Sequence, residues 1–100
     1  GIRTFETYTR YTLDISTVPV IKELSHLPII VDPSHPAGNN KYVPALGRAA
    51  IAAGADGILI EVHTQPSQAL SDGKQSITPV VFTELMDDIK KIAEVMGRQI

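Results

Sequence analysis

Two apolar stretches of the sequence each end in a carboxylate that is followed by a histidine. Asp32 closes the first stretch and precedes His35, and Glu61 lies near the end of the second and precedes His63. About one βα unit separates them, and equivalent points on neighbouring parallel strands lie about 5 Å apart. We therefore expect His35 and Glu61 to converge at the carboxyl ends of two adjacent strands, where α/β folds place their active sites.

A third carboxylate, Asp72, follows in a turn-like segment that can fold back over the strand ends. Histidine, glutamate and aspartate together form a borderline-hard nitrogen and oxygen ligand set, which suits divalent manganese, iron, cobalt or zinc. The sequence therefore predicts a metal site at His35, Glu61 and Asp72. The alternative is that the carboxylates cap helices or pair with basic side chains, and that His35 is a solvent-facing loop residue.

Other polar residues near these segments have weaker claims to chemistry. His63 is expected to orient its loop, with metal ligation as the alternative, and Lys74 and Arg3 could hold a phosphate or carboxylate or remain solvated charges. Segment 38–41 precedes a predicted helix, so it could bind an anion, although a simple turn explains it as well. Segment 54–57 is expected to be a plain helix-to-strand turn.

Regular elements must position these residues, and apolar periodicity predicts five of them. Ser16 is the expected N-cap of the first helix, and Thr78, followed by Pro79, that of the last. Gly54 and Gly97 are expected to end the second and third helices. The predicted elements are helices at 17–24, 42–53 and 79–96 and strands at 27–32 and 57–62, joined by loops at 32–40 and 63–76.

The alternation of helices and strands predicts an α/β fold with a parallel sheet and right-handed crossovers. Consecutive apolar residues indicate that both faces of each strand are buried. Two strands are too few for an independent core, because both would be edges and three helices cannot cover both faces. We therefore expect residues 1–100 to be an incomplete part of one larger domain, a barrel of about 250 residues, with no second domain.

Composition excludes several classes of protein. Nine basic against eleven acidic residues give a net charge of −2, which provides no electrostatic case for a nucleic-acid or anionic-membrane partner. No cysteine is present, so the chain offers no disulfide or thiolate ligand. No apolar run approaches the length of a membrane span, and the first residues lack a signal peptide. A start without methionine favours a processed product or a piece of a longer chain.

Several motifs in order resemble one enzyme family. The chain is similar to the C-terminal part of 3-deoxy-D-arabino-heptulosonate 7-phosphate (DAHP) synthase of the short microbial type, which is related to 3-deoxy-D-manno-octulosonate 8-phosphate synthase. The similarity runs along nearly the whole chain, through segments 1–6, 12–16, 32–35, 54–57, 61–63 and 69–73.

This resemblance implies a (β/α)8 TIM barrel, of which the chain holds the last two strands and three helices. It implies a metal-dependent, aldol-type condensation of phosphoenolpyruvate with erythrose 4-phosphate, which releases phosphate and opens the shikimate pathway to aromatic amino acids in the cytoplasm. In the family the metal is held by an upstream cysteine and by residues that correspond to His35, Glu61 and Asp72. His63 and Lys74 would support these ligands. The residues that bind the two substrates would lie upstream of this chain.

Three alternatives remain open at this point. The chain could be a DAHP synthase segment that is active only with its upstream part. It could belong to the octulosonate synthase relative, or it could be a catalytically incomplete fragment that self-associates through exposed strand edges and apolar helix faces. One departure from the family pattern is at 39–41, where Asn39, Asn40 and Lys41 replace a more basic run.

Overall fold

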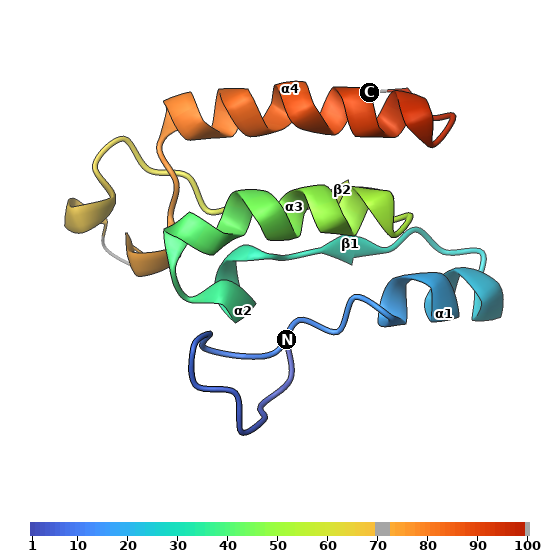
Figure 1. Cartoon of the computed structure of the whole chain (residues 1–100), viewed down its shortest axis with the longest axis horizontal. Coiled ribbons are helices and arrows are strands. Elements are labelled where there is room, and N and C mark those ends of the chain that lie inside the picture. Colours follow the sequence, from blue (N-terminus) through green and yellow to red (C-terminus); the bar gives the residue numbers. More distant parts are fainter. Residues whose placement is uncertain (70–72, 100) are drawn as a thin grey trace.

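The computed structural model describes residues 1–69 and 73–99, and in this part of the chain helices alternate with short strands (Figure 1). The predicted order of helix, strand, helix, strand, helix is confirmed, with a short additional helix after the first strand. The helices and strands are α1 (Thr17–Leu24), β1 (Ile30–Val31), α2 (Ser34–Ala37), α3 (Val43–Ala52), β2 (Gly57–Ile58) and α4 (Pro79–Val95). Short 3-10 helices are η1 (Asn40–Tyr42), η2 (Pro66–Gln68) and η3 (Gly73–Gln75).

The expected ends of the two long helices are confirmed. The Thr78 hydroxyl accepts a hydrogen bond from Val81 N at 3.3 Å and so caps α4. Gly54 and Gly97 follow α3 and α4 with φ of 104° and 75°, backbone angles that side chains rarely tolerate.

The expected capping role of Ser16 is wrong. Its backbone already has helical angles, φ −59° and ψ −26°, and its side chain makes no capping hydrogen bond. The Asp14 carboxylate instead accepts a hydrogen bond from the Thr17 hydroxyl at 2.8 Å. The first backbone N–H groups of α1 bond to carbonyls of the preceding turn, from Thr17 N to Asp14 O at 3.2 Å and from Val18 N to Ile15 O at 3.0 Å.

The two strands pair in parallel, as predicted, but the regular ladder is short. Ile30 lies opposite Gly57 and Val31 opposite Ile58. Two further backbone bonds join the segments, from Asp56 N to Ile29 O at 2.9 Å at the amino end and from Leu59 N to Val31 O at 2.8 Å at the carboxyl end. The predicted strands at 27–32 and 57–62 are thus too long: regular pairing covers two residues of each, and Val62 forms an isolated parallel bridge with Ile77 instead.

The expectation that both strand faces are buried is also wrong for this chain. Val31 points toward the helices and is 7% exposed, whereas Ile30 and Leu59 point to the other face and are 59% and 55% exposed. α1 and α3 contribute the buried neighbours of Val31, whereas neither Ile30 nor Leu59 belongs to a core cluster of the described residues. The prediction that three helices cannot cover both faces is confirmed.

The core consists of two clusters that share Ile58 as a common packing partner. Leu85 and Ile89, each 1% exposed, pack α4 against α3. Gly47 of α3 lies at this contact, where a Cβ would meet Leu85 Cδ2 at 3.4 Å, an ordinary van der Waals distance. Val18 packs α1 against β1 in the second cluster.

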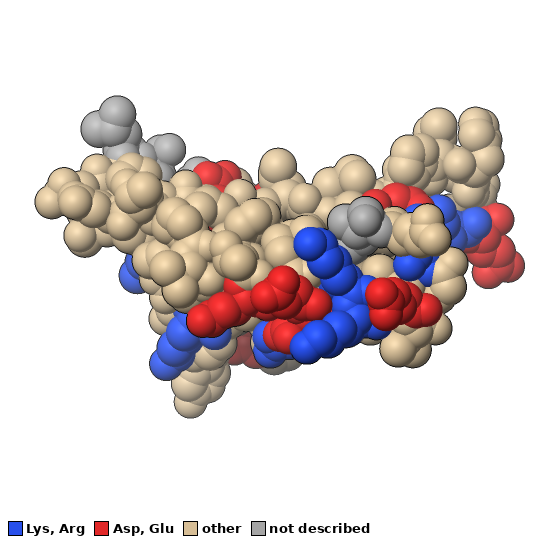
Figure 2. Space-filling view, turned by 90° about the horizontal axis from the view of Figure 1, so that it is seen from above, with Lys and Arg blue, Asp and Glu red and all other residues tan. Residues whose placement is uncertain are grey.

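The outer face of α4 is highly charged. Acidic and basic side chains lie close together over it in the view from above (Figure 2). The exposed charged residues of α4 are Glu84, Asp87, Lys90, Lys91 and Glu94. Among the helices of the described residues, none has the length and hydropathy needed to span a membrane.

Candidate active site

His35 and Glu61 meet at the carboxyl ends of β1 and β2, as predicted. His35 Nε2 lies 3.7 Å from Glu61 Oε1, and the two side chains are 38% and 34% exposed. His35 sits in the first turn of α2, which begins two residues after the end of the β1–Asp32 segment, and Glu61 lies three residues beyond β2. The site therefore depends on the parallel pairing of the two strands, which brings these distant residues together.

The register of the strands places Glu61 opposite the first turn of α2 rather than opposite Asp32. Because Val31 pairs with Ile58, Glu61 extends beyond the level of Asp32. Glu61 N donates a hydrogen bond to the Ser34 hydroxyl at 3.0 Å. Ser34 is fully buried, so this bond forms an interior tie between the two strand ends.

Asp32 organises the turn that carries His35. Its Oδ1 accepts hydrogen bonds from Ser34 N at 2.9 Å and from His35 N at 3.1 Å. Its Oδ2 lies 2.5 Å from His35 Nδ1. The Asp32 carboxylate thus contacts both the backbone and the imidazole ring of the histidine, leaving the opposite ring nitrogen on the side of Glu61.

The donor atoms of His35 and Glu61 fit a shared divalent cation. Bonds from such an ion to imidazole nitrogen and carboxylate oxygen are each about 2.1 Å long, so one ion can bridge atoms up to about 4.2 Å apart. The observed 3.7 Å lies within that reach. Asp72, the third predicted ligand, lies outside the described residues. Among residues 1–69 and 73–99, no group of three or more histidine, cysteine or acidic side chains is placed to hold a metal.

The other polar candidates lie away from this pair or have structural contacts. His63 Nδ1 accepts a hydrogen bond from Gln65 N at 2.9 Å, the loop-orienting contact expected for it. Arg3 stacks over the ring of Tyr11, 5.3 Å from its centroid. Lys74 is exposed in η3 and lines a polar hollow.

Asp56 has a role that the sequence analysis missed. Its carboxylate binds Lys22 Nζ at 2.9 Å and Arg98 Nη2 at 2.5 Å, and it accepts a hydrogen bond from Ile29 N at 2.8 Å. The hydrogen bond from Lys22, followed by those from Arg98 and Ile29 N, holds the pKa of Asp56 well below its usual range. The charged partners come from α1 and from the segment after α4, so periodicity around segment 54–57 contained no signal for them.

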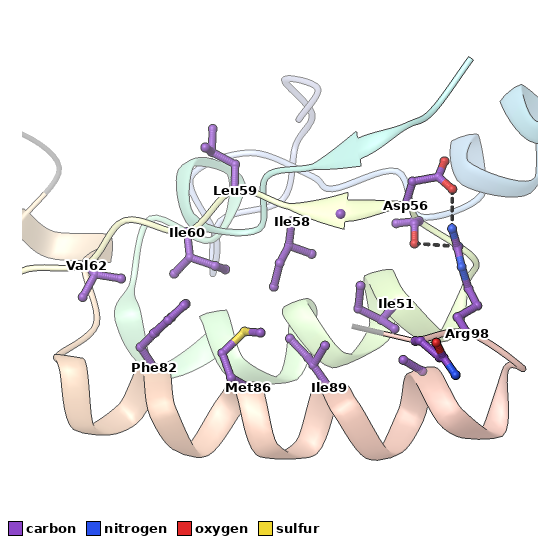
Figure 3. Close-up of a pocket in the computed structure, with 14 residues that line it drawn as sticks. Ile51, Asp56, Ile58, Leu59, Ile60, Val62, Phe82, Met86, Ile89 and Arg98 are labelled. Carbon is purple, nitrogen blue, oxygen red and sulfur yellow. Dashed lines mark hydrogen bonds and ion pairs between the residues drawn. The ribbon is translucent and has the colours of Figure 1, made fainter. Parts of the chain in front are cut away.

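An apolar groove of about 530 Å³ runs between β2 and α4 (Figure 3). Ile58, Ile60 and Val62 face Phe82 and Met86 across it, and the Asp56–Arg98 pair lies at one end. The groove offers surface for packing rather than groups for catalysis, since its charged members are already paired with one another.

Comparison with known proteins identifies the family. The model of the DAHP synthetase I family matches residues 1–96. The chain is 59% identical over 97 residues to phospho-2-dehydro-3-deoxyheptonate aldolase of Thermotoga maritima, covering 97% of this chain and 29% of that protein. It is 37% identical over 81 residues to 2-dehydro-3-deoxyphosphooctonate aldolase of Desulfosudis oleivorans, covering 70% of this chain and 29% of that protein.

Solved structures agree with the sequence comparison. A crystal structure of the Thermotoga maritima phospho-2-dehydro-3-deoxyheptonate aldolase (DAHP synthase) superposes with a TM-score of 0.96 at 57% identity, over 99% of this chain and 29% of that one. A truncated form of the Thermotoga maritima synthase gives the same TM-score, and this chain covers 38% of it. The chain thus spans well under half of the relatives that it matches. It belongs to the DAHP synthetase I family.

Proposed function

We propose that this chain is the segment of a DAHP synthase that supplies most of the metal ligands of the active site. The whole enzyme would condense phosphoenolpyruvate with erythrose 4-phosphate and release phosphate. The convergence of His35 Nε2 and Glu61 Oε1 to 3.7 Å at two adjacent strand ends carries this proposal, together with the identity of 59% to the Thermotoga maritima enzyme.

In this proposal His35, Glu61 and Asp72 hold a divalent manganese, iron, cobalt or zinc ion together with a cysteine from outside this chain. Such an ion, when bound, polarises the aldehyde carbonyl and favours attack by the enol carbon. The chain's own contribution is to hold the two ligands in place: Asp32 orients His35, and Ser34 fixes the backbone of Glu61. The groups that bind phosphoenolpyruvate and the sugar phosphate would come from the rest of the polypeptide.

We further propose that the chain completes a (β/α)8 barrel. The exposed face with Ile30 and Leu59 and the groove between β2 and α4 are the surfaces that additional strands and helices would cover. The enzyme would work in the cytoplasm, either as this barrel or as a homo-oligomer of it.

The proposal is tested on the complete polypeptide that contains this chain. We expect phosphate release from phosphoenolpyruvate with erythrose 4-phosphate, about one bound divalent ion per chain, and loss of both in Glu61→Ala. Glu84→Ala, on the solvated face of α4, is the matched control and should retain both. A complete protein with full activity and no bound metal would overturn the assignment of these ligands.

The octulosonate synthase relative is the second candidate, since 2-dehydro-3-deoxyphosphooctonate aldolases match the same chain at 37% identity and below. Arabinose 5-phosphate, offered in parallel with erythrose 4-phosphate, distinguishes the two activities. Consumption of only the five-carbon sugar would replace our proposal with this one. Light scattering of the isolated 100-residue chain tests the remaining alternative, a self-associating fragment.

A further inference from the structure

Asp32 makes two kinds of contact that can be separated chemically. Oδ1 accepts from the backbone N–H groups of Ser34 and His35, which starts the α2 turn. Oδ2 faces His35 Nδ1 at 2.5 Å. The first contact is a backbone turn that asparagine could also form, whereas the second requires a group that accepts a proton from the ring.

The second contact determines where the ring proton resides. In a neutral imidazole one nitrogen carries the proton and the other carries a lone pair. An ionised carboxylate can only accept a hydrogen bond, so the contact between Asp32 Oδ2 and His35 Nδ1 is a hydrogen bond only when Nδ1 carries the proton. Nε2 then carries the lone pair, and this is the nitrogen that lies 3.7 Å from Glu61 Oε1.

We propose that Asp32 is a positioning residue that fixes the Nδ1–H tautomer and the ring orientation of His35, so that Nε2 presents its lone pair beside Glu61 to a divalent cation. The cation part of this inference rests on the proposed function. The tautomer part stands on the geometry of Asp32 and His35 alone. Carboxylate partners of metal-binding histidines act in this way in other proteins, and their loss costs about 10- to 100-fold in metal affinity.

Asp32→Asn separates this role from a purely structural one. The asparagine oxygen can still accept from Ser34 N and His35 N, so the turn is retained. Its NH₂ group would then face Nδ1 and donate to it, which moves the ring proton to Nε2. A protonated Nε2 has no lone pair for a cation. If Asp32 serves only as a turn residue, this substitution leaves the ring and the metal affinity unchanged.

The test uses the complete polypeptide with ¹⁵N-labelled histidine, without metal and under conditions in which the ring is neutral. The His35 signals are identified by their loss in His35→Gln. In the unsubstituted protein the ¹⁵N shifts should show a protonated Nδ1, and in Asp32→Asn a protonated Nε2. Asp87→Asn, on the exposed face of α4, is the matched control and should leave the His35 signals unchanged.

Titration with Mn²⁺ is the second readout, and Asp32→Asn should weaken binding about 10- to 100-fold. An unprotonated Nδ1 in the unsubstituted protein overturns the inference. This measurement needs no variant, so the inference can be tested even if Asp32→Asn does not fold. Unchanged signals and unchanged Mn²⁺ affinity in a folded Asp32→Asn also overturn it. If the tautomer changes as expected but no protein binds metal, the proposed function fails while the positioning role of Asp32 stands.

Discussion

Ser34→Ala tests whether the two strand ends are held together by a single buried hydroxyl. The Ser34 side chain is fully buried, and its Oγ accepts the hydrogen bond from Glu61 N at 3.0 Å. Alanine removes the acceptor and leaves the amide of Glu61 without this partner. A hydrogen bond of this kind contributes about 0.5–1.5 kcal/mol, and an unsatisfied buried amide raises the cost to about 1–3 kcal/mol.

We therefore expect Ser34→Ala to lower the free energy of unfolding of the complete polypeptide by about 1–3 kcal/mol. The amide of Glu61 should also exchange its hydrogen faster, because the lost bond is its contact with the α2 turn. Metal affinity should fall as well, since the tie fixes the Glu61 backbone relative to His35. Denaturant unfolding, amide hydrogen exchange and Mn²⁺ titration measure the three effects separately.

Ser25→Ala provides the matched control for this prediction. Its hydroxyl also accepts a backbone hydrogen bond, from Leu27 N at 3.1 Å, but the contact is local and exposed. Solvent can replace it, so we expect a loss below about 0.5 kcal/mol, as is usual for surface substitutions. Equal effects of the two substitutions on stability and on Glu61 exchange would refute the reasoning.

Three further predictions follow from the packing and charges. Leu85→Ala should destabilise the protein by about 2–5 kcal/mol in denaturant unfolding, because the side chain is 1% exposed in the core; a loss below 1 kcal/mol would contradict this. The depressed pKa of Asp56 stabilises the fold fully above the ordinary aspartate pKa of about 3.9, and this contribution disappears as the pH falls. Asp56→Asn should therefore flatten the decline of stability in acid, and an unchanged pH profile would exclude the Lys22 and Arg98 contacts as its cause. Gly54→Ala should cost about 1–2 kcal/mol, since φ is 104°; calorimetry showing no loss would mean that the turn relaxes.

Local patterns in the sequence predicted the three longer helices and the meeting of His35 with Glu61, but not the short helix α2. Helical spacing of apolar side chains and the Thr78 cap predicted α4 closely, because helical hydrogen bonds are local. The succession of an apolar strand, a carboxylate and a histidine identified His35 and Glu61, because parallel strands bring their carboxyl ends to one edge.

Interactions between distant segments were decided only by the tertiary structure. The strand register sets Glu61 against Ser34 rather than Asp32, and no pattern within either strand encodes that offset. The Asp56 contacts join α1 to the segment after α4, which periodicity cannot reveal. The exposure of Ile30 follows from α1 and α3 packing on the opposite face of the sheet, beside Val31. Each of these features depends on which residues meet across the fold, and a local sequence pattern reports only neighbours along the chain.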